Sequence, residues 1–295
     1  MGETTIAWCN FTFNPWLGCT KVSAGCANCY AEAYDQRWAG GIHWGKGAPR
    51  RRTAESNWRQ PLKWDRLSAL ERIEFETELN RNARGEPPKI DFRTRTTFPK
   101  RPRVFCASLA DWLDDEVLIA WLTDLLELIH KTPSLDWLLL TKRPQNFESR
   151  MAAALEQLSK RDRWIASIPA GWLANHPNVW IGTTAEDQSN WEKRRKDFFA
   201  IPARVHFVSV EPMLGPVKLF PDCFTAKNPK HLWIICGGES GPKFRPMDPA
   251  WARALRDECA ELKIPFFMKQ LGGVKGGHHM PSFPQDLQIR QFPTP

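Results

Sequence analysis

The sequence predicts an α/β protein built around a partial or complete (β/α) barrel of parallel strands. From residue 100 onward, short segments rich in β-branched and aromatic residues alternate with helical patterns. These apolar segments contain few polar residues, as expected for parallel strands covered on both faces. An open, doubly wound sheet is the competing architecture, but no Gly-x-Gly-x-x-Gly motif follows the first predicted strand.

The first predicted strand is Thr4–Cys9, near the N-terminus. Six more follow at Arg103–Ser108, Trp137–Thr141, Val179–Thr183, Val205–Val210, Leu232–Cys236 and Pro265–Met268. Helical patterns separate them at Asp115–Lys131, Pro144–Leu158, Ser189–Ala200 and Pro249–Leu262. The apolar spacing in EVLIAWLTDLLELIH predicts a helix with one broad buried face.

A basic segment at about residues 35–102 interrupts this alternation. It contains GGIHWGKGAPRRR, a predicted helix at Asp65–Asn82 and a segment rich in Pro and Arg at residues 85–103. We call this last segment the return of the insertion. We expect it to pack on the barrel as an insertion, within a single domain that spans residues 1–295. The tail at about residues 273–295 is rich in Gly and Pro and is predicted to be irregular.

The net charge of +8 is concentrated in the insertion. Between His43 and Arg103, 16 Lys and Arg residues stand against 8 Asp and Glu residues, which accounts for the whole excess. Such a patch favours a polyanionic partner, with DNA or a nucleotide first, although a solvated insertion without a partner is the alternative. The sequence has neither a long apolar run nor an export signal, so we expect a cytoplasmic protein without membrane contact.

Three of the eight cysteines stand close together, as Cys19-x6-Cys26-x2-Cys29. In a chain without an export signal, clustered thiols favour a metal over disulfides. A [4Fe–4S] cluster held by three thiolates keeps one iron open for a cofactor or substrate. A structural zinc ion takes four ligands instead, and the fourth could be Cys9, His43 or a residue distant in sequence. The spacing leaves both metals open.

Polar residues follow directly on the predicted strands, where parallel barrels carry their active sites. Glu186, Ser209 and Glu211 are placed to bind ribose hydroxyls or an ammonium group. Basic residues there are candidates for binding carboxylates or phosphates, namely Lys142, Arg143, Arg245 and Lys269. Pairing of these cations with the same glutamates is the alternative.

The whole chain resembles the uncharacterised three-Cys-motif proteins of bacteriophages and prophages, which look like members of the radical S-adenosylmethionine superfamily. The matching segments are WCNFTFNPWLGCTKVSAGCANCYAE, SLADWL, LLLTKRP, VWIGTTAEDQ, FVSVEPMLGPV, IICGGESGPKFRPM and FFMKQLGG. The resemblance implies a [4Fe–4S] cluster on Cys19, Cys26 and Cys29, with S-adenosylmethionine on the open iron. The first gap is longer than in the common Cys-x3-Cys-x2-Cys pattern, which keeps zinc open.

The resemblance also implies a reaction: with an external electron donor, S-adenosylmethionine is cleaved to methionine and a 5′-deoxyadenosyl radical. The cofactor-binding residues expected from it are Tyr30, Glu186, Ser209, Glu211, Gly237, Gly238 and Glu239, and the catalytic residues are Lys142, Arg143, Glu239 and Lys269. A phage or prophage protein in a bacterial cell, with a basic insertion, favours a nucleic-acid base or nucleotide as substrate. The alternatives are a zinc-stabilised nucleic-acid-binding protein and a radical enzyme that acts on a small molecule or peptide.

Overall fold

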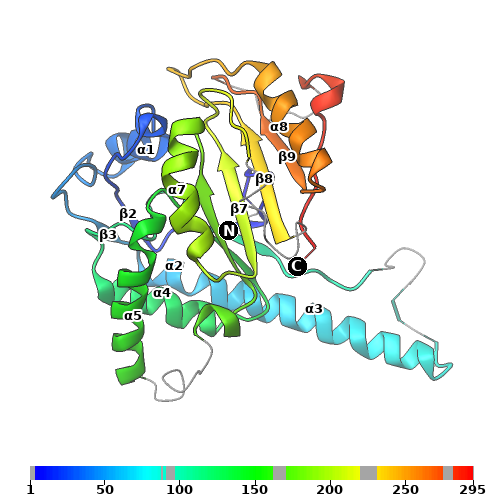
Figure 1. Cartoon of the computed structure of the whole chain (residues 1–295). Helices are drawn as coiled ribbons and strands as arrows, with labels where there is room; N and C mark the ends of the chain where they lie inside the picture. The colour runs from blue at the N-terminus through cyan, green and yellow to red at the C-terminus, as the bar shows by residue number, and fades with distance from the viewer. Residues whose placement is uncertain are drawn as a thin grey trace.

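The computed structural model describes residues 4–87, 89–90, 97–161, 171–219, 231–274 and 282–294. Its centre is a seven-stranded parallel sheet in the order β1-β4-β5-β6-β7-β8-β9, curled into a half-barrel (Figure 1). The strands are Phe11–Phe13, Arg103–Cys106, Asp136–Thr141, Val179–Thr184, Val205–Val210, Leu232–Gly237 and Phe266–Gln270. The predicted α/β class and the partial barrel are confirmed, with β1 and β9 as the two edges.

Helices cover the outer face of the sheet (Figure 1). They are α4, α5, α7 and α8, at Ile119–His130, Phe147–Arg161, Gln188–Ala200 and Pro249–Glu261. Successive side chains of a strand point to opposite faces, so each strand contributes to two cores. Outward residues such as Val104, Ile181 and Ile234 pack in the helix-covered core. Inward residues such as Phe105 and Trp180 form a second cluster inside the half-barrel.

The predicted N-terminal strand is wrong in its position. Thr4–Cys9 forms turns, with the Cys9 amide donating to the Ile6 carbonyl over 3.3 Å, and β1 begins at Phe11. The apolar character of this segment has another cause. Trp8 is 2% exposed and packs against Phe105 inside the half-barrel, with ring centroids 4.5 Å apart. The apolar residues of Thr4–Cys9 are therefore explained by the burial of Trp8 inside the half-barrel and not by a β-strand.

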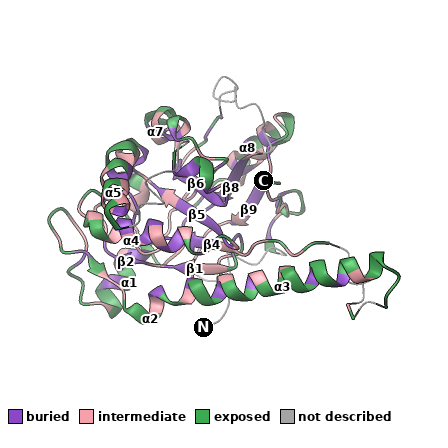
Figure 2. Cartoon of the chain, turned by 90° about the horizontal axis from the view of Figure 1, so that it is seen from below, coloured by how far each residue is buried: buried purple, intermediate pink, exposed green. Residues whose placement is uncertain are grey.

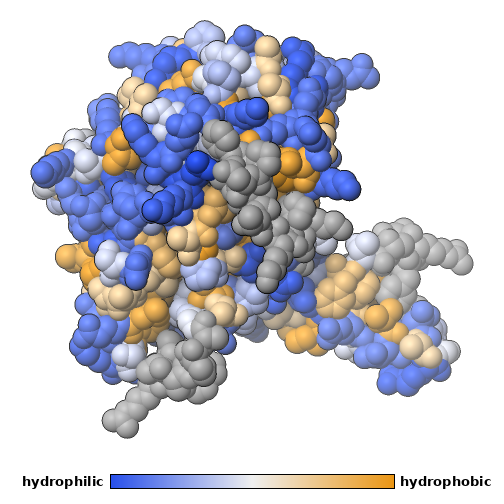
Figure 3. Space-filling model, in the orientation of Figure 1, coloured by the Kyte–Doolittle hydropathy of each residue, from blue (hydrophilic) through white to orange (hydrophobic). Residues whose placement is uncertain are grey.

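Helix α1 (Tyr30–Trp38) leads from the cysteines into the insertion. The insertion itself carries β3 (Arg51–Arg52), which pairs with β2 (Trp16–Leu17), followed by α2 (Glu55–Trp58) and the long helix α3 (Gln60–Ala83). The beginning of α3 packs on the body, and its remainder projects as an arm with many exposed residues (Figure 2). In the space-filling view the arm carries hydrophobic residues among charged ones (Figure 3).

Two arginines of the basic segment are held by carboxylates. Arg50 is buried and lies 2.8 Å from Asp114 and 2.9 Å from Glu116. Arg52 lies 2.9 Å from Asp124. These two arginines are paired with carboxylates inside the fold. The excess of positive charge exposed to solvent near β3 is therefore smaller than the sequence implies.

The described part of the tail folds back along β9. The Met268 amide donates to the Ile289 carbonyl over 2.8 Å, and the Gln291 amide donates to the Phe266 carbonyl over 2.9 Å. Phe292 of the tail packs against Trp233 and so covers part of the cluster inside the half-barrel. No helix in the described ranges has the length and apolar character needed to cross a membrane.

Candidate functional site

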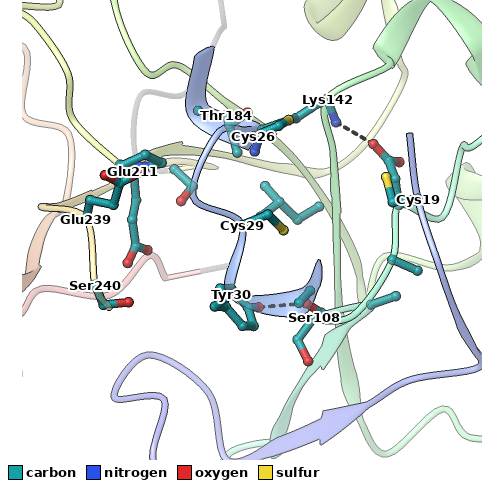
Figure 4. A pocket seen from close by; sticks show the side chains of 18 of the residues that line it. Cys19, Cys26, Cys29, Tyr30, Ser108, Lys142, Thr184, Glu211, Glu239 and Ser240 are labelled. Atoms are coloured by element: carbon teal, nitrogen blue, oxygen red, sulfur yellow. Dashed lines mark hydrogen bonds between the residues drawn. The ribbon is translucent and has the colours of Figure 1, made fainter. Parts of the chain in front are cut away.

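A cavity of about 400 Å³ opens at the carboxyl ends of the strands. All three clustered cysteines border it (Figure 4). Its remaining wall includes most of the polar residues predicted from the strand ends, namely Lys142, Ser209, Glu211, Gly238, Glu239 and Lys269. Tyr30 also borders it, and its hydroxyl donates to the Ser108 carbonyl over 2.6 Å. Arg143, Glu186 and Gly237 lie behind this lining.

The cysteines sit on three different local structures. Cys19 follows Gly18, whose φ of +113° and 2.5 Å spacing from a hypothetical Cβ to the His43 carbonyl oxygen require glycine. Cys26 ends a short 3₁₀ turn at Ala24–Cys26. Cys29 is the N-cap of α1. This cysteine loop, residues 19–29, therefore presents all three of its cysteines to the same cavity.

Arg143 fixes the first cysteine to the end of β5. Its Nη1 lies 3.5 Å from the Cys19 Sγ and 3.0 Å from the Asp111 carboxylate, while Nη2 donates to the Thr20 carbonyl over 2.7 Å. Arg143 is 4% exposed, so these contacts occupy a largely desolvated guanidinium. It is placed as a support for the cysteine loop.

Glu186 anchors the same loop from the end of β6. It is fully buried, accepts a 2.5 Å hydrogen bond from the Ser23 hydroxyl and lies 2.6 Å from Arg194 and 3.7 Å from Lys142. Burial raises the pKa of its carboxyl, but Lys142 and Arg194 outweigh this and hold the pKa below its usual range. Glu186 therefore remains ionised beneath the loop.

Glu239 makes the third connection, from the end of β8. Arg245 binds its carboxylate at 2.5 and 2.9 Å, and the Asn28 side-chain amide donates to it over 3.0 Å. Burial raises the pKa of Glu239, and the hydrogen bonds from Arg245 and Asn28 outweigh that effect and lower it. A second hydrogen bond of 2.8 Å joins Asn28 to the Lys243 carbonyl.

Lys269 and Glu211 form a short ion pair across the ends of β9 and β7. Gln270 donates to the same carboxylate over 3.1 Å and to the Gly238 carbonyl over 2.6 Å. Gly238 has no room for a side chain, since a Cβ would stand 2.1 Å from the Leu271 carbonyl oxygen. The predicted cations are thus paired with carboxylates, and Glu211 and Lys269 both border the cavity.

The floor of the cavity is aromatic and aliphatic. Trp8, Phe105 and Leu140 from the interior cluster border it, and Trp44 enters from the insertion. Trp44 is paired to Cys19 by a parallel bridge, so the insertion reaches the site through the cysteine loop. A polar rim above an apolar floor is typical of a small-molecule site.

Two of the three thiols, those of Cys19 and Cys29, have raised pKa values. Burial, with a smaller contribution from Asp111, raises the pKa of Cys19 to about 12, against the influence of Arg143. Burial also raises the pKa of Cys29. Within the described residues, no three His, Cys, Asp or Glu side chains are already gathered for metal binding. Metal binding by such a thiol displaces its proton.

Neither Cys9 nor His43, the two named candidates for a fourth zinc ligand, borders the cavity. Cys9 is buried, with its thiol 3.8 Å from the Ile6 carbonyl, and the His43 ring lies 2.7 Å from Asp35. Among the residues that the structure describes, the cavity is lined by no cysteine or histidine beyond the three of the motif. Three thiolates can hold a cluster with one iron left open. The lining also contains the carboxylates of Asp111, Glu211 and Glu239, any of which could be a fourth ligand to zinc.

Sequence reasoning missed Ser23 and Asn28, which tie the cysteine loop to Glu186 and Glu239. Their only signal was their position between the cysteines, which says nothing of partners more than 150 residues away. Arg194 was missed because it lies within a helix, at α7, away from any strand end.

Comparison with known families gives one match. The model of a family described as "Protein of unknown function (DUF5131)" matches residues 3–285. The chain belongs to this family. No curated protein and no solved structure matches it. The match spans the cysteine loop, the whole sheet and the strand-end residues, so family membership covers the complete candidate site.

Proposed function

We propose that this chain is a radical S-adenosylmethionine enzyme with a [4Fe–4S] cluster on Cys19, Cys26 and Cys29. The observation that carries the proposal is the position of the three thiols on one cavity at the carboxyl ends of parallel strands, with no further cysteine or histidine in the described lining. The sequence resemblance to the radical superfamily supports it. When bound, the cluster and S-adenosylmethionine supply reductive cleavage to methionine and a 5′-deoxyadenosyl radical.

The residues of this chain bind and orient the cofactor. Glu211 and Glu239 offer carboxylates to the ammonium of S-adenosylmethionine, and Lys269 is placed to meet its carboxylate. Gly238 borders the cavity with backbone groups, and Tyr30 and Ser209 supply hydroxyls for the ribose.

Other residues support this arrangement from behind. Arg143, Glu186 and Asn28 hold the cysteine loop against the ends of three strands. The apolar floor formed by Trp8, Phe105 and Leu140 excludes water from the reacting atoms.

Anaerobic reconstitution with iron and sulfide tests the proposal. We expect brown protein that contains iron and sulfide, and release of 5′-deoxyadenosine when S-adenosylmethionine and dithionite are added. Ala in place of Cys19, Cys26 or Cys29 should remove the iron, whereas Cys259→Ala, on α8 outside the cavity, should keep it. Colourless protein with stoichiometric zinc and no nucleoside product would establish the zinc-stabilised alternative.

We further propose a nucleic-acid base or nucleotide as the substrate. Lys46 and Arg51 are exposed on the insertion, which contacts the cysteine loop where the Gly45 amide donates to the Cys19 carbonyl over 3.0 Å. A positive surface beside the cavity attracts a polyanion, while the aromatic floor accepts a flat base.

Binding of a single-stranded DNA oligonucleotide at low salt tests the substrate class. Lys46→Glu combined with Arg51→Glu should weaken binding about tenfold or more, and Lys196→Glu, an exposed change on α7, should not. No binding at low salt by the wild-type protein would favour a small molecule or peptide as substrate.

A further inference from the structure

The projecting helix α3 has two faces of different character. One face is covered by the body and by the return of the insertion, and carries the buried residues Trp64, Ser68, Phe75 and Glu78. Phe75 packs edge-on against Phe98 of the return, with ring centroids 5.5 Å apart. On the same side, Arg72 donates to the Pro99 carbonyl over 2.9 Å.

The opposite face carries apolar side chains as well, and these are exposed. Leu62, Leu70 and Ile73 are 42%, 52% and 59% exposed. Together with Arg66 and Thr77 they follow the helical spacing i, i+4, i+8, i+11 and i+15, and all five are exposed. We call the face formed by residues 62, 66, 70, 73 and 77 the outer stripe. A surface helix usually has one apolar face, so a second one marks an interaction surface.

Charge on α3 argues against nucleic acid on this surface. The helix carries four basic and five acidic side chains, so the local charge is negative although the insertion as a whole is basic. A polyanion would face several glutamates along the arm. The occupant must therefore be a protein surface with both apolar and charged groups.

The positions of the charged residues along α3 indicate which protein surface would fit the outer stripe. Arg66 lies within the first half of the outer stripe and Lys63 lies beside it, whereas Glu74 and Glu76 lie beside the second half. Asp65, in the first half, is half-buried and accepts a hydrogen bond of 2.6 Å from the Ser134 amide. A second α3 that runs in the opposite direction would bring the part with Lys63 and Arg66 against the part with Glu74 and Glu76, at both ends. Its two-fold axis would pass near Ala69 and Leu70 and would place Leu62 opposite Thr77 and Arg66 opposite Ile73.

We propose that two copies of this chain associate through the outer stripes of antiparallel α3 helices. This closed two-fold contact places the same face of both copies together, with the opposite charges of its two halves facing one another. With 24 residues, the helix is about 36 Å long, so the contact has the size of a small, reversible interface. The proposal is independent of the metal and of the reaction.

Sedimentation velocity over roughly 1–200 µM protein tests it. We expect a concentration-dependent dimer, which Ile73→Asn weakens at least about tenfold because the buried apolar contact is lost. Leu118→Asn is the matched control, because Leu118 is also 59% exposed but lies outside α3, and it should leave the dimer unchanged. Far-ultraviolet circular dichroism confirms that each variant is folded.

Charge reversal tests the antiparallel arrangement. Lys63→Glu and Glu74→Lys should each weaken the dimer, and the double variant should restore it, because each exchanged residue then meets its exchanged counterpart. Wild-type protein that stays monomeric to about 200 µM would overturn the proposal. So would a dimer that is insensitive to Ile73→Asn, or a monomer whose α3 binds DNA in an Ile73-dependent way.

Discussion

The side-chain amide of Asn28 donates a hydrogen bond of 3.0 Å to Oε2 of Glu239, which joins the segment between Cys26 and Cys29 to the end of β8. Glu239 is also held by Arg245, so its carboxylate is fixed before any cofactor binds. Asn28 thereby positions two cysteines through a residue that itself borders the cavity. The cysteine loop and the strand-end carboxylates form one connected unit.

Asn28→Asp should reduce retention of the metal. The new carboxylate would face Glu239 without a donor between them, and the loop between Cys26 and Cys29 would lose its connection to β8. We expect the iron content after reconstitution and desalting to fall to below about half. Asn175→Asp, an exposed change outside the site, is the control. Equal iron retention in the two variants would contradict the proposed positioning role.

Glu186→Gln should lower the free energy of unfolding by about 3 kcal/mol. The variant keeps the shape of the side chain but removes the charge that Arg194 and Lys142 face in a fully buried position. Chemical denaturation measures the change, and Glu192→Gln, exposed on the same helix α7 as Arg194, should shift it by less than about 0.5 kcal/mol. A small effect at Glu186 would mean that this carboxylate is not a structural anchor.

Gly25→Ala should disturb the cysteine loop. An added Cβ would stand 2.4 Å from Cγ and 2.5 Å from Oε1 of Glu186, so either the carboxylate or the 3₁₀ turn that carries Cys26 must move. We expect weaker iron binding together with lower thermal stability. Gly215→Ala is the matched control, because its Cβ would meet only Asp187, at 3.8 Å. Unchanged iron binding by Gly25→Ala would show that the turn can relax without loss of the site.

The sheet from β4 to β9 was predictable because each strand is a continuous apolar segment of ordinary length. An apolar segment alone does not identify a strand, as Thr4–Cys9 shows. Its residue Trp8 is buried inside the half-barrel without belonging to a strand. The cysteines and the strand-end residues were likewise visible in the sequence. Their pairing was not, because Glu239 and Asn28 stand 211 residues apart and no local pattern records such a contact.

The basic insertion illustrates the same limit in terms of charge. From the sequence, every arginine of the insertion contributes equally to the positive surface charge. In the structure, Arg50 is buried against Asp114, whereas its neighbour Arg51 is exposed. Arg50→Met should therefore lower the free energy of unfolding by about 3 kcal/mol, since it leaves a buried carboxylate unpaired. Arg51→Met should change it by less than about 0.5 kcal/mol, and urea denaturation compares the two. Similar values for both variants would contradict the structural assignment of Arg50.

His206 on β7 should make the protein less stable in mild acid. Burial lowers the pKa of its imidazole from the ordinary 6.5 to about 4, and the ring lies 3.0 Å from the Ile201 carbonyl and edge-on to Phe198. The folded state thus favours the neutral ring, so the unfolded chain takes up a proton first as the pH falls. Stability that is fully present above the ordinary pKa is then lost between about pH 6.5 and 4.

His206→Gln isolates this effect, because glutamine keeps a side-chain donor for Ile201 but does not titrate. Urea denaturation of both proteins at several pH values gives the difference in unfolding free energy between wild type and variant. We expect that difference to move in favour of the variant by up to about 3 kcal/mol as the pH falls from neutral to about 4. Parallel pH profiles would mean that the imidazole takes up its proton in the folded protein as readily as in the unfolded chain.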